Sequence, residues 1–129
     1  MDLVKKLRLL SARRPLVLNP PEGYLELFSA QPGVEVPATQ PEGQHDWVQF
    51  FARSRDDLAA WAPVAPASVT HDGVLWACFP KKSAGLRTDL DRDHGWELLA
   101  GAGLRPVTQV AIDETWSALR FRPTERVGR

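Results

Sequence analysis

The sequence predicts an α/β fold of three layers, with a mostly parallel sheet between helices and an antiparallel hairpin at the C-terminal end. Short apolar runs alternate with segments of helical periodicity, the pattern of strands connected through helices. The run VLWACFP (74–80) is apolar at consecutive positions, as in a strand covered on both faces. The last two predicted strands are separated only by Glu114 and Thr115, which is hairpin spacing.

The first half of the chain contains three predicted strands and one predicted helix. Each strand is a short apolar run bounded by turn residues: PLVLN (15–19), VEVP (34–37) and DWVQFFA (46–52). GYLELFS (23–29) has helical spacing and ends before QPG (31–33). The polar segment 38–44 is rich in turn residues and is predicted to be a surface loop.

The second half begins with a predicted helix. Ser54 is its expected N-cap, Asp57 occupies the acidic third position, and the helix should end near Pro63 or Pro66 because proline cannot continue it. A turn at HDG (71–73) precedes the strand 74–80. The remaining elements are a helix at 94–104, with Trp96, Leu98 and Leu99 inward and Gly101 or Gly103 as its terminator, and strands at 106–113 and 116–123.

Length and composition are those of one globular domain, residues 1–129. Of the 129 residues, 43% are hydrophobic and 25% are charged, and 16 basic residues offset 16 acidic ones. We therefore expect no nucleic-acid partner and no membrane association. Cys78 is the only cysteine and lies in an apolar run, so it is expected to be buried. The lack of cysteine pairs and of a signal-peptide pattern predicts a cytoplasmic protein, and oligomeric state stays open.

Residues 1–14 are predicted to form an N-terminal helix or arm, and residues 124–129 a frayed polar tail. Leu3, Leu7 and Leu10 share one helical face, apart from the basic residues of the segment. A short helix packed on the body explains this pattern. The alternative is a basic amphipathic arm that contacts a membrane or nucleic acid.

The order of elements resembles the class I methyltransferase fold, a Rossmann-like architecture, over residues 15–123. In that family a glycine-rich turn after the first strand holds S-adenosylmethionine through backbone N–H groups, and an acid at the end of the second strand contacts the ribose. Here the turn is NPPEG, with one glycine (Gly23) and two prolines that donate no N–H, and Glu35 is the only candidate acid. The resemblance implies a methyltransferase-like fold with a missing or rebuilt cofactor site, and no cofactor is expected.

The strings VLNPPEGY, FPKKSAGLRTDLDRDHGW and QVAIDETWSALRFRP also resemble an uncharacterised family of small bacterial proteins. Members are expected to carry forms such as VLNAPEEF, YPKKSS, NRDxGW and VAIDxxWSALRFR. The similarity runs through nearly the whole chain. It implies no reaction, because the family has no assigned activity.

Asn-Pro-Pro in VLNPPEGY is the string with which amino-group methyltransferases hold a target amine, followed by an aromatic residue that stacks on the base. Here Glu22 follows the prolines, Tyr24 comes two residues late, and the motif follows the first strand instead of the fourth. We favour a rigid strand-to-helix turn, with Glu22 in the first helical turn, where the helix dipole favours an acid.

PKKSAG (80–85) lies at the carboxyl end of the strongest predicted strand and is a candidate anion site. Ligands of open α/β sheets bind at such strand ends. Charge and hydrogen-bond donors for a phosphate or carboxylate come from Lys81, Lys82, Ser83 and Gly85. A solvated basic loop is the alternative.

TDLDRDHGW (88–96) begins like an EF-hand loop, but His94 replaces the required glycine and no bidentate glutamate follows in place. No metal is therefore expected. We predict instead that Asp91 or Asp93 caps the following helix. The expected cationic partner is Lys82, Arg87 or Arg92.

In the last predicted strand, alternation places Trp116 and Arg120 on one face and Leu119 and Phe121 on the other. Arg120 is predicted to lie over Trp116 as a structural cation–π pair, or to stack a planar ligand with it. Asp113 ends the preceding strand and is expected to meet the Lys81–Lys82 loop.

These features predict a ligand site at the carboxyl ends of the strands. Its expected residues are Asn19, Glu22, Lys81, Lys82, Asp113 and Trp116. The preferred function is a degenerate, non-catalytic methyltransferase-like domain that binds a small anionic ligand or a protein partner there. The alternative is a group-transfer enzyme with a rebuilt cofactor site. No Ser/His/Asp or Cys/His arrangement supports hydrolysis, so no catalytic residue is predicted.

Overall fold

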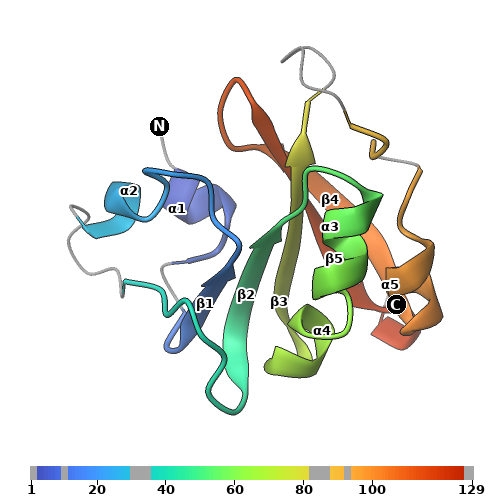
Figure 1. Ribbon diagram of the computed structural model, residues 1–129. Helices are drawn as coiled ribbons and strands as arrows, with labels where there is room; N and C mark the ends of the chain where they lie inside the picture. Colours follow the sequence, from blue (N-terminus) through green and yellow to red (C-terminus); the bar gives the residue numbers. More distant parts are fainter. Residues whose placement is uncertain (1–2, 10–11, 30–35, 82–87, 92–93, 127–129) are drawn as a thin grey trace.

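The computed structural model describes residues 3–9, 12–29, 36–81, 88–91 and 94–126 (Figure 1). Within these residues, five strands form one sheet in the order β1–β2–β3–β5–β4. The strands are β1 (Pro15–Leu18), β2 (His45–Phe51), β3 (Val69–Pro80), β4 (Leu104–Ala111) and β5 (Trp116–Pro123). All five correspond to predicted strands, but β3 begins at Val69 instead of Val74.

The sheet is mixed, and our prediction of a mostly parallel sheet was wrong. β1 pairs with β2 and β2 pairs with β3 in parallel, whereas β5 pairs with both β3 and β4 in antiparallel. The antiparallel hairpin of β4 and β5 is confirmed. Because β5 inserts between β3 and β4, the hairpin brings two antiparallel interfaces into the sheet instead of one.

The predicted strand at 34–37 is not formed within the described part of this segment, whose first two residues lie outside it. What remains is one parallel bridge from Ala38 to β1. Ala38 N–H donates to the Pro15 carbonyl at 3.0 Å, and the Ala38 carbonyl accepts from Val17 N–H at 2.9 Å. Pro37 has no N–H to donate, so a ladder cannot continue regularly through it.

β3 bulges where a turn was predicted. Along β2 the register advances from His45 to Trp47, while along β3 it advances from Val69 to Val74. The residues of β3 between Val69 and Val74 have no registered partner in β2. One of them, Asp72, has a left-handed backbone with φ of 57°. HDG therefore interrupts the pairing with β2 but lies within β3, which is continuous from Val69 to Pro80, so the predicted turn was wrong.

Five short α-helices and one 3-10 helix lie within the described ranges. They are α1 (Leu3–Lys6), α2 (Glu26–Ser29), α3 (Arg55–Trp61), α4 (Ala65–Ser68), α5 (Glu97–Gly101) and η2 (Thr124–Arg126). None of them is long and apolar enough to cross a membrane. Of the helix that we predicted at 23–29, only the last turn is helical, and this turn is α2.

α3 begins as predicted. The Ser54 Oγ accepts from the Asp57 N–H at 3.3 Å, and the Asp57 carboxylate accepts from the Arg53 N–H at 2.9 Å. α3 ends before Pro63, and Pro66 lies in the first turn of α4, where its missing N–H costs no hydrogen bond.

α5 is shorter than the helix predicted at 94–104. Gly103 follows its C-cap with φ of 84°, so Gly103, and not Gly101, is the terminator. Trp96 and Leu99 are buried as predicted, but Leu98 is 52% exposed, so the prediction that it points inward was wrong. Successive helical residues lie about 100° apart, so a helix of this length turns one of two neighbouring leucines outward.

The C-terminal end of the described chain is held in place. Of the segment 124–129 that we expected to fray, Thr124–Arg126 form η2. The Thr124 N–H and hydroxyl both donate to the Gly103 carbonyl, at 2.8 and 3.0 Å. Residues 127–129 lie outside the described residues.

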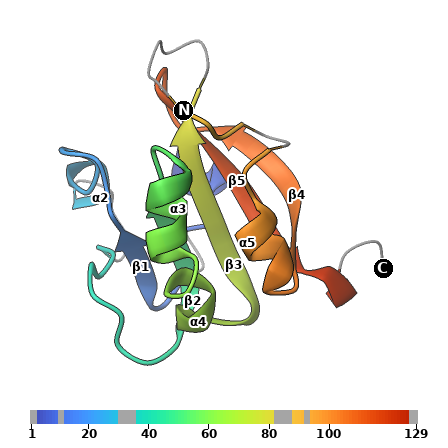
Figure 2. The same cartoon turned by 45° about the vertical axis from the view of Figure 1, so that its right-hand side comes forward.

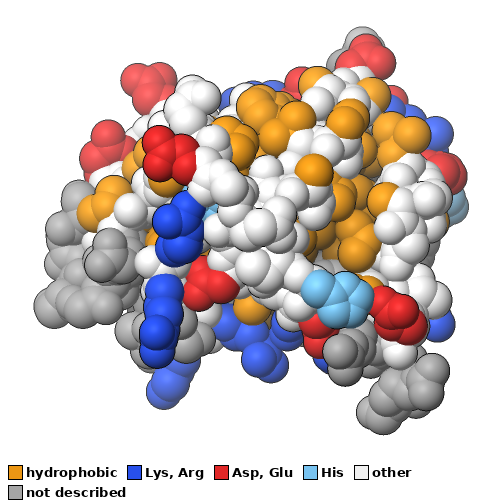
Figure 3. Space-filling model, turned by 90° about the horizontal axis from the view of Figure 1, so that it is seen from below, with side chains coloured by type: hydrophobic (Ala, Val, Ile, Leu, Met, Phe, Trp, Pro, Cys, Tyr) orange, Lys and Arg blue, Asp and Glu red, His pale blue; other side chains and the backbone are white. Residues whose placement is uncertain are grey.

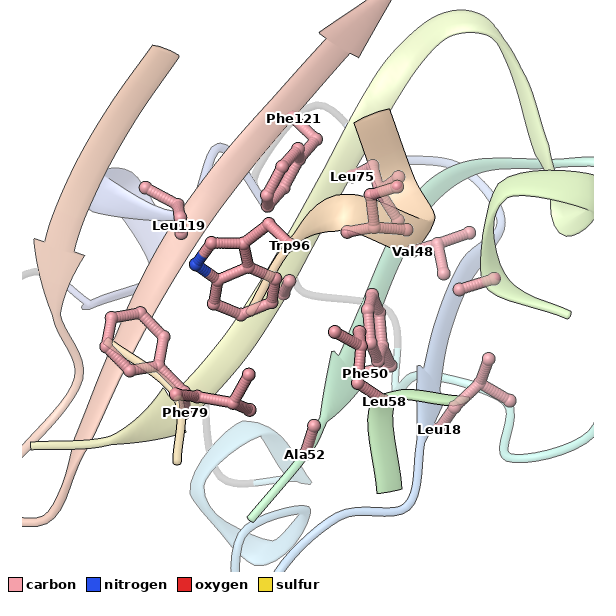
Figure 4. Close-up of a cluster of buried hydrophobic side chains, with 14 of the residues drawn as sticks. Leu18, Val48, Phe50, Ala52, Leu58, Leu75, Phe79, Trp96, Leu119 and Phe121 are labelled. Atoms are coloured by element: carbon pink, nitrogen blue, oxygen red, sulfur yellow. The ribbon is translucent and has the colours of Figure 1, made fainter. Parts of the chain in front are cut away.

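α3, α4 and α5 cover one face of the sheet (Figure 1, Figure 2). The core on this face joins Leu75 and Phe121 of the sheet to Leu58 of α3 and to Trp96 (Figure 4). The Trp96 ring packs against Phe79 and Phe121, with centroids 5.5 and 5.4 Å away. Full burial of each large apolar side chain stabilises the fold by roughly 1.5–3 kcal/mol.

The N-terminal segment and α2 pack on the other face. Leu7 and Leu9 are buried there beside Trp47 and Trp76. The Leu7 carbonyl accepts from the indole N–H groups of both Trp47 and Trp76, at 2.7 and 2.9 Å. These contacts support a segment packed on the body. Leu10 lies outside the described residues.

Candidate functional site

The carboxyl ends of β1, β2 and β3 meet the start of β5 at one edge of the sheet, which we call the carboxyl edge. The register brings Phe51 of β2 beside Cys78 of β3, and Pro80 of β3 beside Trp116 of β5. Four predicted site residues follow these strand ends or close the hairpin: Asn19, Lys81, Asp113 and Trp116. Glu22 lies in the turn after β1, and Lys82 lies outside the described residues.

The segment 19–23 that follows β1 is a tight turn. Tyr24 N–H donates to the Pro21 carbonyl at 3.1 Å, and Gly23 has φ of 82°, as the third residue of a type II turn requires. Glu22 is exposed and precedes α2, so our placement of it in the first turn of a helix was wrong. Gly23, with its positive φ, interrupts the helical conformation after Glu22, so α2 begins only at Glu26.

Asn19 connects the ends of β1 and β2. Its backbone is left-handed, with φ of 55°, a conformation that asparagine adopts more readily than most residues. Its Nδ2 donates to the Phe51 carbonyl at 2.8 Å, just beyond the last registered pair of the two strands. The amide nitrogen of Asn19 is thus committed to the sheet.

The end of β3 meets the β4–β5 turn. Lys81 N–H donates to the Thr115 carbonyl at 2.7 Å. Oδ1 of Asp113 accepts from the N–H groups of Thr115 and Trp116, both at 2.8 Å, and so closes the hairpin as an Asx turn. Two members of the predicted anion loop besides Lys82 lie outside the described residues: Ser83 and Gly85.

Trp116 is buried at this edge, and a cation lies over it. Its ring packs edge-on against Phe51, with centroids 5.0 Å apart, and the Arg53 guanidinium carbon lies 5.7 Å from the centre of the Trp116 ring. The structure places Arg53 in the position that we predicted for Arg120. Arg120 shares the face of Trp116 but lies four residues further along β5, about 13 Å away. A signal for Arg53 was present in the sequence: it comes just after β2, as Lys81 comes just after β3, and residues that follow parallel strands lie at the same edge of the sheet.

Beneath the carboxyl edge, three polar side chains form a buried chain of hydrogen bonds. The Tyr24 hydroxyl donates to Gln49 Oε1 at 2.7 Å, and Gln49 Nε2 donates to Cys78 Sγ at 3.2 Å. Sequence reasoning missed this network. Its signal is the single glutamine within the otherwise apolar run of β2.

Burial raises the pKa of the Tyr24 hydroxyl and the pKa of the Cys78 thiol well above their usual values. The hydrogen bonds with Gln49 oppose both shifts, and the nearby Asp113 carboxylate adds to both. Both groups therefore stay protonated at neutral pH. Cys78 is buried as predicted, and it lacks the thiolate character of a nucleophile.

The acidic stretch that begins at residue 88 fixes neighbouring elements. Asp89 Oδ1 accepts from the Arg55 N–H of α3 at 2.7 Å. The Asp91 carboxylate lies 2.9 Å from His94 Nδ1, and the Asp91 carbonyl accepts from the Trp96 indole at 2.6 Å. The N-cap of α5 is Trp96, which forms no side-chain cap bond among the described residues, so a cap by Asp91 or Asp93 stays a prediction.

The other residues named with this stretch lie outside the described part of the chain: Asp93, Arg87 and Arg92. Among the residues that the structure does describe, no group of three or more His, Cys, Asp or Glu side chains is placed to hold a metal ion.

A hollow of about 800 Å³ lies at the opposite edge, between the β3 bulge, the α5–β4 turn and the end of β5. Leu75, Leu104 and Phe121 contribute apolar lining. His71 and Glu125 also line it and form an ion pair, with Nε2 and Oε1 3.3 Å apart. Figure 3 views the molecule from below and shows hydrophobic side chains gathered on this face. The volume is that of a small-molecule pocket, at a place where the sequence predicted no site.

Comparison with known proteins finds similarities to solved structures only. No protein-family model and no curated protein sequence matches the chain. Ribosomal protein L11 methylase from Lactobacillus delbrueckii subsp. bulgaricus is similar with a TM-score of 0.51 at 13% identity, over 86% of this chain and 58% of that one. N-methyltransferase NodS from Bradyrhizobium japonicum is similar with a TM-score of 0.51 at 12% identity, over 95% and 94%. LepI in complex with SAH and a substrate analogue gives 0.50 at 16% identity, over 95% and 39%.

These similarities show a methyltransferase-like α/β fold, which confirms the resemblance in element order. The chain spans little more than half of the methylase and nearly all of NodS. At such identities the likeness is one of fold alone. Membership in the family of small bacterial proteins stays a prediction.

Proposed function

We propose that this chain is a methyltransferase-like domain that has lost the S-adenosylmethionine site and binds a small anionic ligand at its carboxyl edge. The observation that carries the proposal is the turn at 19–23. It occupies the place where the family resemblance puts the cofactor, yet its two prolines offer no N–H and Asn19 Nδ2 is bonded to β2.

Two further features weaken the fit of S-adenosylmethionine. Within the described residues α2 spans four residues and begins at Glu26, three residues beyond Gly23, so its N-terminus does not follow β1 directly. The Tyr24 ring is buried and its hydroxyl is bonded to Gln49, so this aromatic residue offers no open face to a base. Glu35, the candidate ribose contact, lies outside the described residues.

The carboxyl edge offers positive charge instead. Arg53 is exposed and Lys81 is half-buried, and neither side chain forms an ion pair within the described residues. Trp116 supports the Arg53 guanidinium from below. Two cations beside a ring at strand ends suit a carboxylate or phosphate group.

The remaining expected residues have supporting roles in this proposal. Asp113 fixes the hairpin that carries Trp116, and Glu22 is exposed in the turn after β1. A protein partner at the same edge is the other ligand class, in a cytoplasmic setting. The alternative function is a group-transfer enzyme with a cofactor site rebuilt from side chains, and the observation that favours it is the methyltransferase-like fold itself.

Thermal unfolding in the presence of candidate ligands tests the proposal. A ligand that binds only the native state raises Tm in proportion to its saturation. We expect an increase of several degrees with a carboxylated or phosphorylated metabolite and none with S-adenosylmethionine. Arg53→Gln and Lys81→Gln should each weaken the anion affinity about tenfold, the value of one charge-assisted hydrogen bond.

Arg13→Gln is the matched control, because it removes an exposed arginine from the segment before β1. It should leave the affinity unchanged. An increase in Tm with S-adenosylmethionine equal to that with the best anion would favour the group-transfer enzyme. Unchanged affinity in Arg53→Gln and Lys81→Gln would reject the carboxyl edge as the binding site.

A further inference from the structure

Arginines gather on the sheet face that carries the N-terminal segment, away from the carboxyl edge. Arg120 and Arg122 follow the alternation of Trp116 and Ala118 along β5, whose side chains belong to the core of that face. Arg105 of β4 lies directly opposite Arg122. The antiparallel register thus brings three arginines into one corner of the sheet.

Arg8 joins them from the N-terminal segment. The carbonyl of the preceding residue, Leu7, accepts from the Trp76 indole, and Trp76 is the β3 partner of Arg120. Arg8 is exposed and has a left-handed backbone, with φ of 62°. We call Arg8, Arg105, Arg120 and Arg122 the arginine cluster.

One member of the arginine cluster has an acidic partner in the β3 bulge. Arg122 Nε and Nη2 donate to the two carboxylate oxygens of Asp72, at 2.9 and 2.8 Å. This bidentate pair fixes the guanidinium and offsets its charge.

Among the described residues, no acidic side chain forms an ion pair with Arg120. Its Nε is buried and forms no hydrogen bond within the described part of the chain. Burial, followed by the positive charges of Arg8 and Arg122, lowers the pKa of Arg120, and Asp72 opposes the shift. Buried donors without an acceptor are rare in native proteins, and an ion at the site is one of the explanations for them.

We propose that Arg8 and Arg120 bind a phosphate group. The Asp72 carboxylate offsets the charge of Arg122. The guanidinium groups of Arg8 and Arg120 then supply two positive charges, and Arg120 Nε is the buried donor beside them. A phosphate monoester carries about −1.5 to −2 charges at pH 7 and several acceptor oxygens. Guanidinium groups suit phosphate geometry, and Arg120 Nε gains its missing acceptor. Arg105 is exposed at the rim and adds long-range attraction.

This site is separate from the proposed anion site at the carboxyl edge. Arg120 pairs with Trp76, whereas Trp116 pairs with Pro80, four residues away along β5. The strand rise places the two regions about 13 Å apart. The phosphate proposal therefore does not depend on the proposed function.

Solution NMR tests the proposal through the arginine Nε–Hε signals of the full chain. Sodium phosphate is titrated against sodium chloride of equal ionic strength. We expect the Arg120 signal to shift and saturate with phosphate but not with chloride. Arg8→Gln and Arg120→Gln should each weaken phosphate binding about tenfold. Arg13→Gln, which removes an exposed arginine from the segment before β1, should bind phosphate as the unmodified chain does.

A nucleoside monophosphate is titrated in parallel. If the nucleotide binds more tightly than inorganic phosphate, the site recognises a larger phosphorylated ligand. If the two bind equally, the site recognises the phosphate group alone. A shift that never saturates and is equal in all variants would be a general salt effect and would overturn the proposal. Binding of a single-stranded oligonucleotide without binding of either phosphate would also overturn it. The Arg120 signal of the unmodified chain decides the question even if Arg120→Gln does not fold.

Discussion

Gln49 lies in the middle of β2, with its side chain fully buried. Both ends of its amide are used, Oε1 by the Tyr24 hydroxyl and Nε2 by Cys78. Burial of an amide or hydroxyl costs free energy unless its hydrogen bonds are replaced. The three side chains are therefore interdependent. An apolar substitution at one of them leaves a buried polar group of a neighbour without its hydrogen bond.

Substitution of Gln49 tests this interdependence. Gln49→Leu should lower the free energy of unfolding by about 1–3 kcal/mol, because the buried Tyr24 hydroxyl loses its acceptor. In a double variant with Tyr24→Phe, no hydroxyl is left without a partner. We expect the double variant to lose less stability than the sum of the single losses in urea unfolding. Strict additivity would contradict a shared network.

At the residue scale, side-chain direction was predictable but side-chain partners were not. Strand alternation correctly placed Trp116 on the opposite face from Phe121. It did not identify Arg53 as the cation over Trp116, because Arg53 reaches that ring only through the pairing of β2, β3 and β5.

Among the elements, the β3 bulge connects packing with charge. It presents Asp72 to Arg122 and forms part of the lining of the hollow at the edge opposite the carboxyl edge. Gly73 permits the bulge by its lack of a side chain. A Cβ there would lie 2.5 Å from Thr70 Oγ1 and 3.0 Å from the Thr70 carbonyl oxygen.

Gly73→Ala should therefore destabilise the protein by about 1–3 kcal/mol, the usual cost of overpacking. Gly101→Ala is its matched control. Gly101 is exposed in α5, and a Cβ there would meet open space, so alanine should stabilise by about 0.5–1 kcal/mol through helix propensity. Guanidinium unfolding of the two variants should give opposite signs. A neutral Gly73→Ala would show that the bulge relaxes without cost.

In the whole molecule, one tyrosine and one cysteine are buried in the same core. Burial raises the pKa of both groups above their values in the unfolded chain. A raised pKa of an acid means that the native state keeps its proton longer than the unfolded state does. Stability from these groups is therefore fully present below the unfolded pKa values and is lost as pH rises above them.

The free energy of unfolding should accordingly fall above about pH 8.5, where an unfolded thiol ionises, and more steeply above about pH 10, where an unfolded tyrosine does. Each group contributes a slope of up to about 1.4 kcal/mol per pH unit. Urea unfolding over an alkaline pH series measures the slope, and Tyr24→Phe combined with Cys78→Ala should flatten it. Tyrosinate absorbance reports Tyr24 directly, and its appearance in the folded protein near pH 10 would contradict the prediction.

The sequence by itself determined the five strands, the C-terminal hairpin, the Ser54 cap and the burial of Cys78. These features depend on local patterns, since apolar runs, turn residues and caps act on their own neighbourhood. Of the candidate site, sequence order also placed Asn19, Lys81, Asp113 and Trp116 at strand ends.

Only the tertiary structure decided what those side chains contact. It formed a single bridge at Ala38, just after the predicted strand at 34–37, inserted β5 between β3 and β4, and joined Tyr24, Gln49 and Cys78 in one network. It also brought Arg8 to Arg120 through the Leu7 carbonyl. Each of these outcomes depends on sheet order and register between segments far apart in the chain, which local periodicity does not specify.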